Sequence, residues 1–407
     1  MATTPVEVRR RFFVRMKHPT QMEALAPAML VDVDAYRSRT DANILIAALA
    51  PHELDRLAQQ QVEIIPSTQY QPLQAPDSVH VALDFHPLNM DDVMSHIKAD
   101  KAWEQSRGEN VHIAIVDTGI CGTLPEFAGG KQSQFRWSLS PQDDPWTDAK
   151  GHGSMTAAIA AATNASGGRY SGVAPDSPII ACKTSFDDTE LYQIYEYLIQ
   201  LVESGKVKRL VVNNSYGRYV CAAPTINEDD PFPTILRRAV SKGIVVVFAA
   251  GNNHVVICKN DPTQCGPNTI WSVNSFDEVI SVGTVDRNNR MDQPPRTLGG
   301  YSHRDSSRGP GQFASAISPK PDCVAPTYGE VVWGCGYVPM EWWGTSGAAP
   351  QVAGLAALIL SKNPSLTAAQ VQGIIKKTCV PIGLAPTCAG AGLIDCMAAL
   401  SKASGKV

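Results

Sequence analysis

Three residues that could together activate a nucleophile are spread over more than half of the chain. Asp117 follows an apolar run, His152 stands between two glycines, and Ser346 precedes a long apolar segment. A serine hydroxyl is a poor nucleophile at neutral pH unless a base such as histidine takes its proton, and an acid can hold that imidazole in the required tautomer. Each residue alone is more commonly a turn, cap or core residue. Together they predict an activated serine.

Ser346 lies in the stretch 344–360, where small residues give way to a long apolar run. This run is too apolar for a surface helix, so we expect a buried helix over 346–361. Pro350 suits the first turn of such a helix, where a missing N–H group costs little. Free N–H groups and the positive end of the helix dipole would then face the serine hydroxyl. An ordinary N-cap serine is the alternative interpretation of this stretch.

Short apolar runs alternate with helical patterns from residue 111 onward, which is typical of an α/β fold with a mainly parallel central sheet. Most of the runs are continuously apolar, as expected when helices cover both faces of the sheet. We expect strands at 111–116, 179–183, 210–213, 244–249 and 279–285. We expect helices at 91–103, 153–162, 188–204, 234–242, 346–361 and 368–378.

Polar residues and glycines follow these strands, at the edge where ligands of parallel sheets bind. Asp117 follows the first strand, and Asn252 comes shortly after the fourth. The amide of Asn252 could donate a hydrogen bond to a tetrahedral oxyanion. The other residues delivered to this edge are Ser215, Tyr216, Gly217, Ala250 and Gly251.

The first 75 residues indicate a separate small α+β domain, residues 1–75. We expect its strands at 11–16, 29–33, 42–49 and 62–65, and its helices at 20–29 and 51–60. Residues 66–90 are rich in Pro, Gln and Ser and have no periodicity, which indicates an extended arm. We place the linker or cleavable part of this arm at 76–90 and the main domain at 91–407.

The composition excludes several classes of partner. The net charge is -4, with 44% hydrophobic and 18% charged residues, so neither nucleic acid nor an anionic membrane is an expected partner. No uncharged apolar stretch reaches the roughly 18 residues of a membrane span. The first 30 residues lack the pattern of a signal peptide, which favours a cytoplasmic location.

The ten cysteines point instead to an extracellular, oxidising compartment. Three pairs are close in sequence and suggest disulfides that close short loops. These pairs are Cys258 with Cys265, Cys323 with Cys335, and Cys379 with Cys388. Reduced, half-buried thiols are the alternative, and Cys182 is expected to be a core thiol. No Cys/His spacing resembles a zinc site, so no metal ligand is assigned.

The order Asp117, His152, Ser346 along the chain is that of subtilisin. Seven motifs occur in the order of the subtilisin-like serine protease family: VDTGI, GHGS, NNSYG, AAGNN, SSRGP, KPDCVAP and GTSGAAP. The chain resembles this family over most of its length. The resemblance implies a three-layer subtilisin-like domain in which Asp117, His152 and Ser346 form a catalytic triad. It also implies that Asn252 supplies the side-chain donor of the oxyanion hole.

The resemblance extends to substrate and partners. It implies that Ser215, Tyr216 and Gly217 pair with a protein or peptide substrate as an added strand, beside Ala250 and Gly251. A segment near 188–190 would form the opposite wall of the cleft. The amino-terminal domain resembles a propeptide that assists folding and then inhibits the enzyme, with autocleavage within 66–85. A permanently attached accessory domain is the alternative.

Two positions depart from the family pattern. Ser154 stands where the family usually has Thr, with little expected effect, and Gly347 stands where it usually has Met, which could loosen the turn or widen the space beside Ser346. We find no counterpart of the family's calcium loop, so no cofactor is expected and a structural calcium stays open. The leading function is a serine endopeptidase. A peptide ligase or macrocyclase that uses the same acyl-enzyme, and a non-catalytic peptide-binding relative, are the alternatives.

Overall fold

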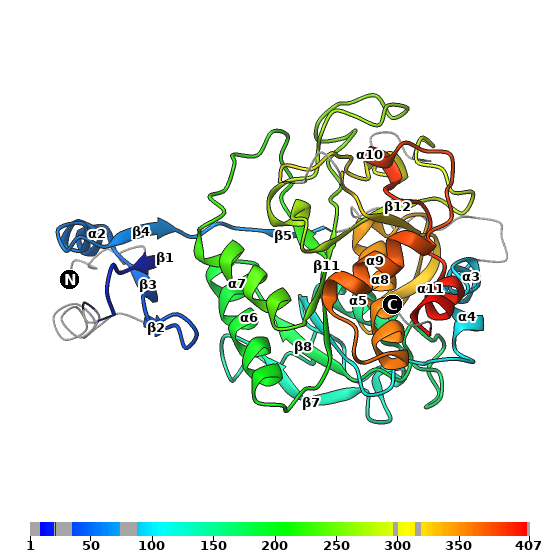
Figure 1. Ribbon diagram of the computed structural model, residues 1–407, viewed down its shortest axis with the longest axis horizontal. Helices are drawn as coiled ribbons and strands as arrows, with labels where there is room; N and C mark the ends of the chain where they lie inside the picture. Colours follow the sequence, from blue (N-terminus) through cyan, green and yellow to red (C-terminus); the bar gives the residue numbers. More distant parts are fainter. Residues whose placement is uncertain are drawn as a thin grey trace, which may run out of the picture.

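A computed structural model describes residues 9–19, 21, 35–73, 88–295, 300–313 and 319–404. A small amino-terminal sheet lies at one end of the molecule, and an extended segment that includes β5 (Gln71–Pro72) runs from it into a much larger α/β body (Figure 1). The expected division at residues 75 and 90 stays a prediction, because most of the segment between the two bodies lies outside the described residues.

A seven-stranded sheet forms the centre of the larger body, in the order β13-β12-β11-β9-β6-β8-β7. Every neighbouring pair in this sheet is parallel. The strands are β6 (His112–Asp117), β7 (Gln132–Trp137), β8 (Ile179–Lys183), β9 (Leu210–Asn214), β11 (Val245–Ala249), β12 (Ile280–Val285) and β13 (Cys323–Pro326). The two edge strands β7 and β13 were not expected. β7 alternates between exposed and partly buried residues, so it lacks the continuous apolar run that marks the inner strands.

Helices cover both faces of the sheet, which gives the expected three layers (Figure 1). The first face carries α3 (Met90–His96), α4 (Ala99–Ala102), α5 (His152–Ala161), α8 (Gly344–Lys362), α9 (Ala368–Thr378) and α11 (Cys396–Ala403). The second face carries α6 (Asp188–Glu203) and α7 (Pro231–Ser241). The apolar side chains of α8 are fully buried, as its composition predicts.

The expected helix over 91–103 is wrong as a single element, because the chain breaks it at Lys98. Lys98 has a left-handed backbone with φ of 59°, which no α-helix continues through. This turn lets Ile97 and Ala99, one on each side of it, both be buried in the core. The Lys98 ammonium is then 2.5 Å from the Asp395 carboxylate.

In the described part of the amino-terminal body, an antiparallel sheet of order β2-β3-β1-β4 is accompanied by one helix. Its elements are β1 (Arg10–Arg15), β2 (Ala35–Arg37), β3 (Ile44–Leu49), α2 (Pro51–Ala58) and β4 (Glu63–Pro66). The expected helix 20–29, except for residue 21, and the expected strand 29–33 lie outside the described residues. The helix at 51 begins with Pro51, and the Glu53 carboxylate accepts a hydrogen bond from the Ala50 N–H at 2.8 Å.

The disulfides join distant parts of the chain rather than closing short loops. They are Cys121–Cys335 and Cys265–Cys388, separated by 214 and 123 residues in sequence. All three expected pairings are therefore wrong. Two other pairs of cysteines are close together but form no disulfide. Cys258 hydrogen-bonds with Cys221, and Cys323 hydrogen-bonds with Cys379. Cys182 is a buried free thiol, as expected.

The remaining short elements are β10 (Tyr216–Gly217), β14 (Gly329–Trp333), β15 (Gly336–Met340) and α10 (Pro386–Ala389). Among the described residues, no helix is long and apolar enough to cross a membrane. In the same part of the chain, no group of three or more His, Cys, Asp and Glu residues could hold a metal ion.

Candidate active site

The sheet and its flanking helices bring Asp117 and His152 into direct contact. Asp117 is the last residue of β6, and His152 is the first residue of α5. Nδ1 of His152 lies 2.7 Å from Oδ1 of Asp117, and both side chains are buried. A carboxylate can only accept, so Nδ1 carries a proton and Nε2 is left as the basic nitrogen.

The environment of His152 favours its charged form despite burial. Burial alone would lower the pKa of His152, but the charge of Asp117 and the hydrogen bond to it raise this pKa above its usual value. The Asp148 carboxylate adds to the rise. Among the described residues, Nε2 of His152 has no hydrogen-bond partner. The backbone of Leu73 also helps to raise the pKa of His152, and Nε2 is free to accept a proton.

Glycines on both sides of His152 let the backbone approach its neighbours closely. Gly151 has φ of 85°, and a Cβ there would lie 2.6 Å from Nε1 of Trp333. A Cβ on Gly153 would lie 2.0 Å from the carbonyl oxygen of Gly119. Neither position can hold a side chain, which accounts for the Gly-His-Gly pattern.

Asp148 holds this helix start in place, and the sequence reasoning missed it. Its Oδ1 accepts the N–H of Gly151 at 2.8 Å and the hydroxyl of Thr118 at 2.9 Å. Its Oδ2 accepts the N–H and the hydroxyl of Ser154, at 2.8 and 2.7 Å. The Ser154 hydroxyl therefore has a positioning contact in this chain. The only signal in the sequence is an acid three residues before the Gly-His-Gly pattern.

Ser346 lies in the first turn of α8, but the helix begins earlier than expected. It starts at Gly344, so Pro350 lies inside the helix and not in its first turn. Proline has no N–H to donate to the carbonyl of Ser346 four residues before it. The Ser215 hydroxyl donates to that carbonyl oxygen instead, at 3.0 Å. The residue at the N-cap position is Trp343, so the N-cap interpretation of Ser346 is also wrong.

Gly347 leaves no extra space beside Ser346. A Cβ on Gly347 would lie 2.5 Å from Cβ of Trp343 and 3.4 Å from a methyl carbon of Thr327. The Trp343 side chain is fully buried and donates its indole N–H to the carbonyl oxygen of Gly329 at 2.9 Å. The expected wider space is therefore filled by this tryptophan, whose packing requires glycine at 347.

The arm that leaves the amino-terminal sheet lies against these residues as an added strand. β5 pairs antiparallel with β10, so that Pro72 is opposite Tyr216 and Gln71 is opposite Gly217. The Leu73 N–H donates to the carbonyl oxygen of Ser215 at 3.0 Å. Residues 215–217, which the sequence assigns to substrate binding, are thus brought together with an extended peptide.

The other side of the arm contacts the segment that leads into α6. The Tyr70 N–H donates to the carbonyl oxygen of Phe186 at 2.9 Å, and the Asp188 N–H donates to that of Thr68 at 3.0 Å. This wall comprises residues 185–188 and overlaps the expected segment near 188–190 at Asp188, the first residue of α6.

The carbonyl group of Leu73 lies where the candidate residues meet. The Ser346 hydroxyl donates to the Leu73 carbonyl oxygen, and Nδ2 of Asn252 lies 3.4 Å from the same oxygen. The N–H and the hydroxyl of Thr345 donate to Oδ1 of Asn252 at 3.1 and 2.9 Å, which turns the Asn252 amide donor toward Leu73. A peptide carbonyl thus contacts a serine hydroxyl and an oriented amide.

Ala250 and Gly251 make no hydrogen bond to the arm among the described residues. The Ala250 N–H donates to the carbonyl oxygen of Val282, and the Gly251 N–H donates to the hydroxyl of Thr345. The Gly251 N–H instead holds the Thr345 hydroxyl, which donates to Oδ1 of Asn252.

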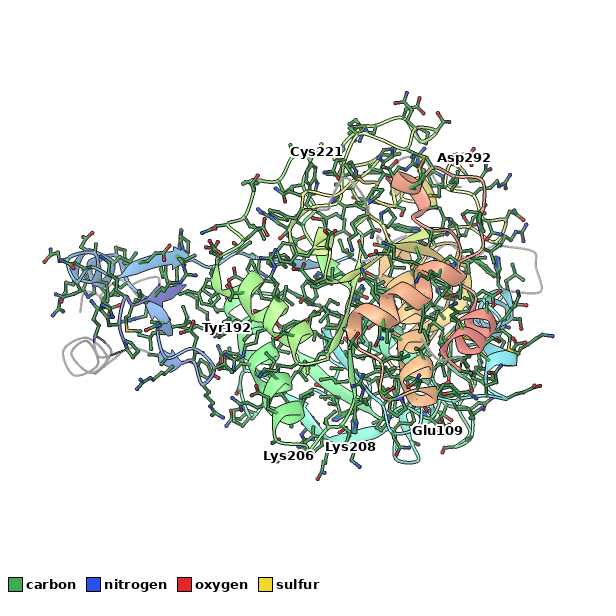
Figure 2. All side chains as sticks on the ribbon, viewed as in Figure 1. Glu109, Tyr192, Lys206, Lys208, Cys221 and Asp292 are labelled. Atoms are coloured by element: carbon green, nitrogen blue, oxygen red, sulfur yellow. A yellow bond between two sulfur atoms is a disulfide. The ribbon has the colours of Figure 1, made fainter. Side chains whose placement is uncertain are left out.

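The amino-terminal sheet also contacts the outer side of α6. The buried Glu196 carboxylate accepts hydrogen bonds from the N–H groups of Arg39 and Thr40 and from the hydroxyls of Tyr36, Ser38 and Thr40. Tyr192, labelled in Figure 2 at the junction of the two bodies, packs edge-on against Phe13 with ring centres 5.6 Å apart. The sequence reasoning did not identify this contact surface.

Comparison with known proteins identifies the family. The model of the subtilase family matches residues 108–393. Subtilisin of Bacillus pumilus is 32% identical over 308 residues, which are 75% of this chain and 97% of that protein. Subtilisin E of Bacillus subtilis (strain 168) is 31% identical over 308 residues, which are 75% of this chain and 70% of that protein.

Two solved structures share the fold. Fervidolysin from Fervidobacterium pennivorans, a keratinolytic enzyme related to subtilisin, has a TM-score of 0.66 at 18% identity, over 98% of this chain and 62% of that one. MycP1 with its N-terminal propeptide removed has a TM-score of 0.57 at 24% identity, over 78% of this chain and 97% of that one. From the family match and the identity to the subtilisins, the chain belongs to the subtilase family and is a subtilisin-like serine peptidase.

Proposed function

We propose that this chain is an endopeptidase that works through an acyl-enzyme on Ser346 and that its first substrate is its own arm. Asp117 and His152 complete the triad, and Asn252 stabilises the oxyanion. The observation that carries the proposal is the Leu73 carbonyl group, which contacts the hydroxyl of Ser346 and faces the amide of Asn252.

The reaction follows from these contacts. Ser346 Oγ attacks the carbonyl carbon of Leu73 while Nε2 of His152 takes the hydroxyl proton. Asp117 stabilises the imidazolium, and the Asn252 amide donates to the developing oxyanion. The bond to the nitrogen of Gln74 then breaks, and His152 gives its proton to that nitrogen. Water, activated by the same histidine, releases the acyl group as the Leu73 carboxylate.

The Ser346 hydroxyl must change partners for the first step. In the structure it donates to the carbonyl oxygens of Leu73 and Ser215. For the first step the hydroxyl has to turn to Nε2 of His152, which forms no hydrogen bond among the described residues. Such a loose arrangement is common before the transition state forms.

The amino-terminal body is proposed to be an intramolecular inhibitor after this cleavage. Its arm fills the cleft as a substrate would, with Leu73 fully buried. The polar contacts of Glu196 on α6 would hold the cleaved body in place. Assistance in folding is part of the same proposal.

Amino-terminal sequencing and intact-mass measurement of the purified chain test the proposal, with Ser346→Ala beside the wild type. We expect the wild type to yield a new amino terminus at Gln74 and the variant to stay whole. The rate should fall by about 10⁶, the loss known for the nucleophile of subtilisin and not one derived from this structure. Equal processing of both proteins would refute autocatalysis.

The same samples distinguish the alternatives. Incubation with peptides that end in Tyr-Gln-Pro-Leu-Gln, with mass spectrometry, gives shorter products for a peptidase and joined products for a ligase. A fluorophosphonate probe labels Ser346 in either enzyme. A wild type that stays whole and is not labelled would indicate a non-catalytic peptide-binding relative.

A further inference from the structure

The Tyr70 side chain is enclosed by the peptidase although it belongs to the arm. Tyr70 is only 2% exposed. Its ring packs edge-on against Tyr216 and Phe232, with ring centres 5.9 and 5.6 Å apart. Rings in this arrangement attract one another beyond the area that they bury. The peptidase therefore surrounds the ring of Tyr70 with aromatic side chains.

The end of the Tyr70 ring that carries the hydroxyl faces a polar group. The hydroxyl oxygen of Tyr70 lies 2.8 Å from Oγ of Ser272, and Ser272 is 1% exposed. Among the described residues, Ser272 Oγ forms no other hydrogen bond. A phenol pairs with this hydroxyl, whereas a phenylalanine ring would leave the buried hydroxyl without its partner.

The backbone around Ser272 is arranged to present this hydroxyl. Ser272 begins a short 3₁₀ helix, Ser272–Ser275, with φ of 59°, a left-handed conformation that is uncommon for residues other than glycine. The Gln312 side chain accepts the Ser272 N–H at 2.9 Å, and the Ser275 hydroxyl donates to the Ser272 carbonyl oxygen at 2.8 Å. These contacts hold Ser272 in the conformation that faces Tyr70.

The position of Tyr70 relative to the scissile bond follows from the proposed function, on which this inference rests. Leu73 contributes the carbonyl that contacts Ser346, so Tyr70 is three residues before the residue that is cleaved. We propose that the peptidase selects substrates with tyrosine at this position over phenylalanine, and that Ser272 is the residue that reads the phenol hydroxyl. The substrate class is thus peptides of the form Tyr-Xaa-Xaa-Leu, cleaved after leucine.

Paired peptide substrates test the selection. The full chain is allowed to process itself, and the peptidase is separated from the amino-terminal fragment. kcat/KM is then measured for acetyl-Tyr-Gln-Pro-Leu p-nitroanilide and its Phe-Gln-Pro-Leu counterpart. An unpaired buried hydroxyl predicts a preference for tyrosine of about 5- to 100-fold in wild type. A ratio near one in the wild type would overturn the inference.

Two variants assign the preference to Ser272. In Ser272→Ala the ratio should fall to near one. Ser275→Ala removes a hydroxyl of the same 3₁₀ helix that positions Ser272 but does not contact Tyr70, so it should lower the ratio less than Ser272→Ala does. If both variants lose the ratio equally, the shape of the helix and not the Ser272 hydroxyl sets the preference.

The arm itself gives a second readout inside the intact chain. Tyr70→Phe should slow cleavage after Leu73 by the same factor as Ser272→Ala, and the double variant should be no slower than either one. Additive losses would overturn the assignment of the pair. Failure of the proposed function looks different: neither peptide is cleaved by the wild type, and the fluorophosphonate probe does not label Ser346.

Discussion

The amino-terminal part of the chain contacts the peptidase through two surfaces of opposite character. The arm 68–73 is held mainly by backbone hydrogen bonds to β10 and to the segment before α6. The sheet is held on α6 by side chains, above all by the carboxylate of Glu196. Backbone pairing accepts many sequences, whereas a buried carboxylate with five specific donors fits one partner.

This difference separates two tasks that the amino-terminal part performs at once. The arm occupies a cleft that other peptides must enter later, so its contacts have to be replaceable. The surface on α6 lies away from the cleft and has no such requirement. Substitutions in the cleft should therefore change catalysis, and substitutions on α6 should change only the affinity for the amino-terminal body.

The largest effect that separates the two surfaces is expected for Asn252→Ala. Its amide is 3.4 Å from the Leu73 carbonyl oxygen, a long hydrogen bond that contributes little before the reaction. In the transition state the oxygen is charged, and loss of the donor should lower kcat by about 10²–10³, the figure known for the equivalent donor in subtilisin. Steady-state kinetics on a peptide measure this loss.

The affinity of the amino-terminal body is the control for Asn252→Ala. Dilution of the processed chain, with activity followed as the fragment dissociates, gives its dissociation constant. We expect less than a fewfold change in this constant. An equal loss in kcat and in affinity would mean that Asn252 already stabilises the bound arm. The cleft would then serve binding as much as catalysis.

A smaller effect is expected for Glu196→Gln, and it should change the affinity for the amino-terminal body and not kcat. The variant places an NH₂ group against donors that now face a carboxylate oxygen, and Glu196 is fully buried. Loss of hydrogen bonds to a charged group should weaken binding of the amino-terminal body by about 10- to 100-fold. The dilution assay measures this change, while kcat/KM of the separated peptidase should stay constant.

Gln200→Ala on the same helix is the matched control. The Gln200 side chain is half-buried and forms no hydrogen bond among the described residues. This variant should leave both quantities unchanged. A change in kcat/KM for Glu196→Gln alone would show that Glu196 on α6 influences the cleft, contrary to the separate roles of the two surfaces.

The sequence predicts the parts of this site that depend on local patterns. Continuous apolar runs predict the inner strands, and Asp117 follows one of them directly. Glycines beside His152 predict a close backbone approach, which Gly119 and Trp333 account for. The contact between Asp117 and His152 needed a strand end and a helix start at one sheet edge, which the parallel alternation of strands and helices supplies.

Other parts depend on contacts that no local pattern records. The arm has no periodicity because its extended shape is imposed by β10, so Leu73 could not be identified from its own sequence. A proline pattern predicts the first turn of a helix, but Pro350 lies inside α8. The Ser215 hydroxyl, which comes from a distant strand end, donates to the carbonyl oxygen that the missing N–H of Pro350 leaves free. Cys121 and Cys335 pair across 214 residues, whereas sequence reasoning favoured short loops.

The smallest expected effect is a dependence of arm binding on pH, through Asp188. This carboxyl is covered by the arm at Thr68, and burial raises its pKa to about 8, with the charges of Asp187 and Asp230 adding to the rise. Departure of the arm should return the pKa toward its usual value of about 3.9. The bound state therefore holds a proton that the free state releases.

The sign of the effect follows from this difference. Binding is strongest below the free-state pKa, weakens by at most about tenfold per pH unit as pH rises, and levels off above about 8. The dilution assay at several pH values between 6 and 9 measures the slope, and Asp188→Asn should flatten it. His152 is a second buried group of the cleft with a shifted pKa, which the charge of Asp117 and the hydrogen bond to it raise despite burial. A slope that persists in Asp188→Asn would show that the pH dependence of arm binding comes from the imidazole of His152 and not from the carboxyl of Asp188.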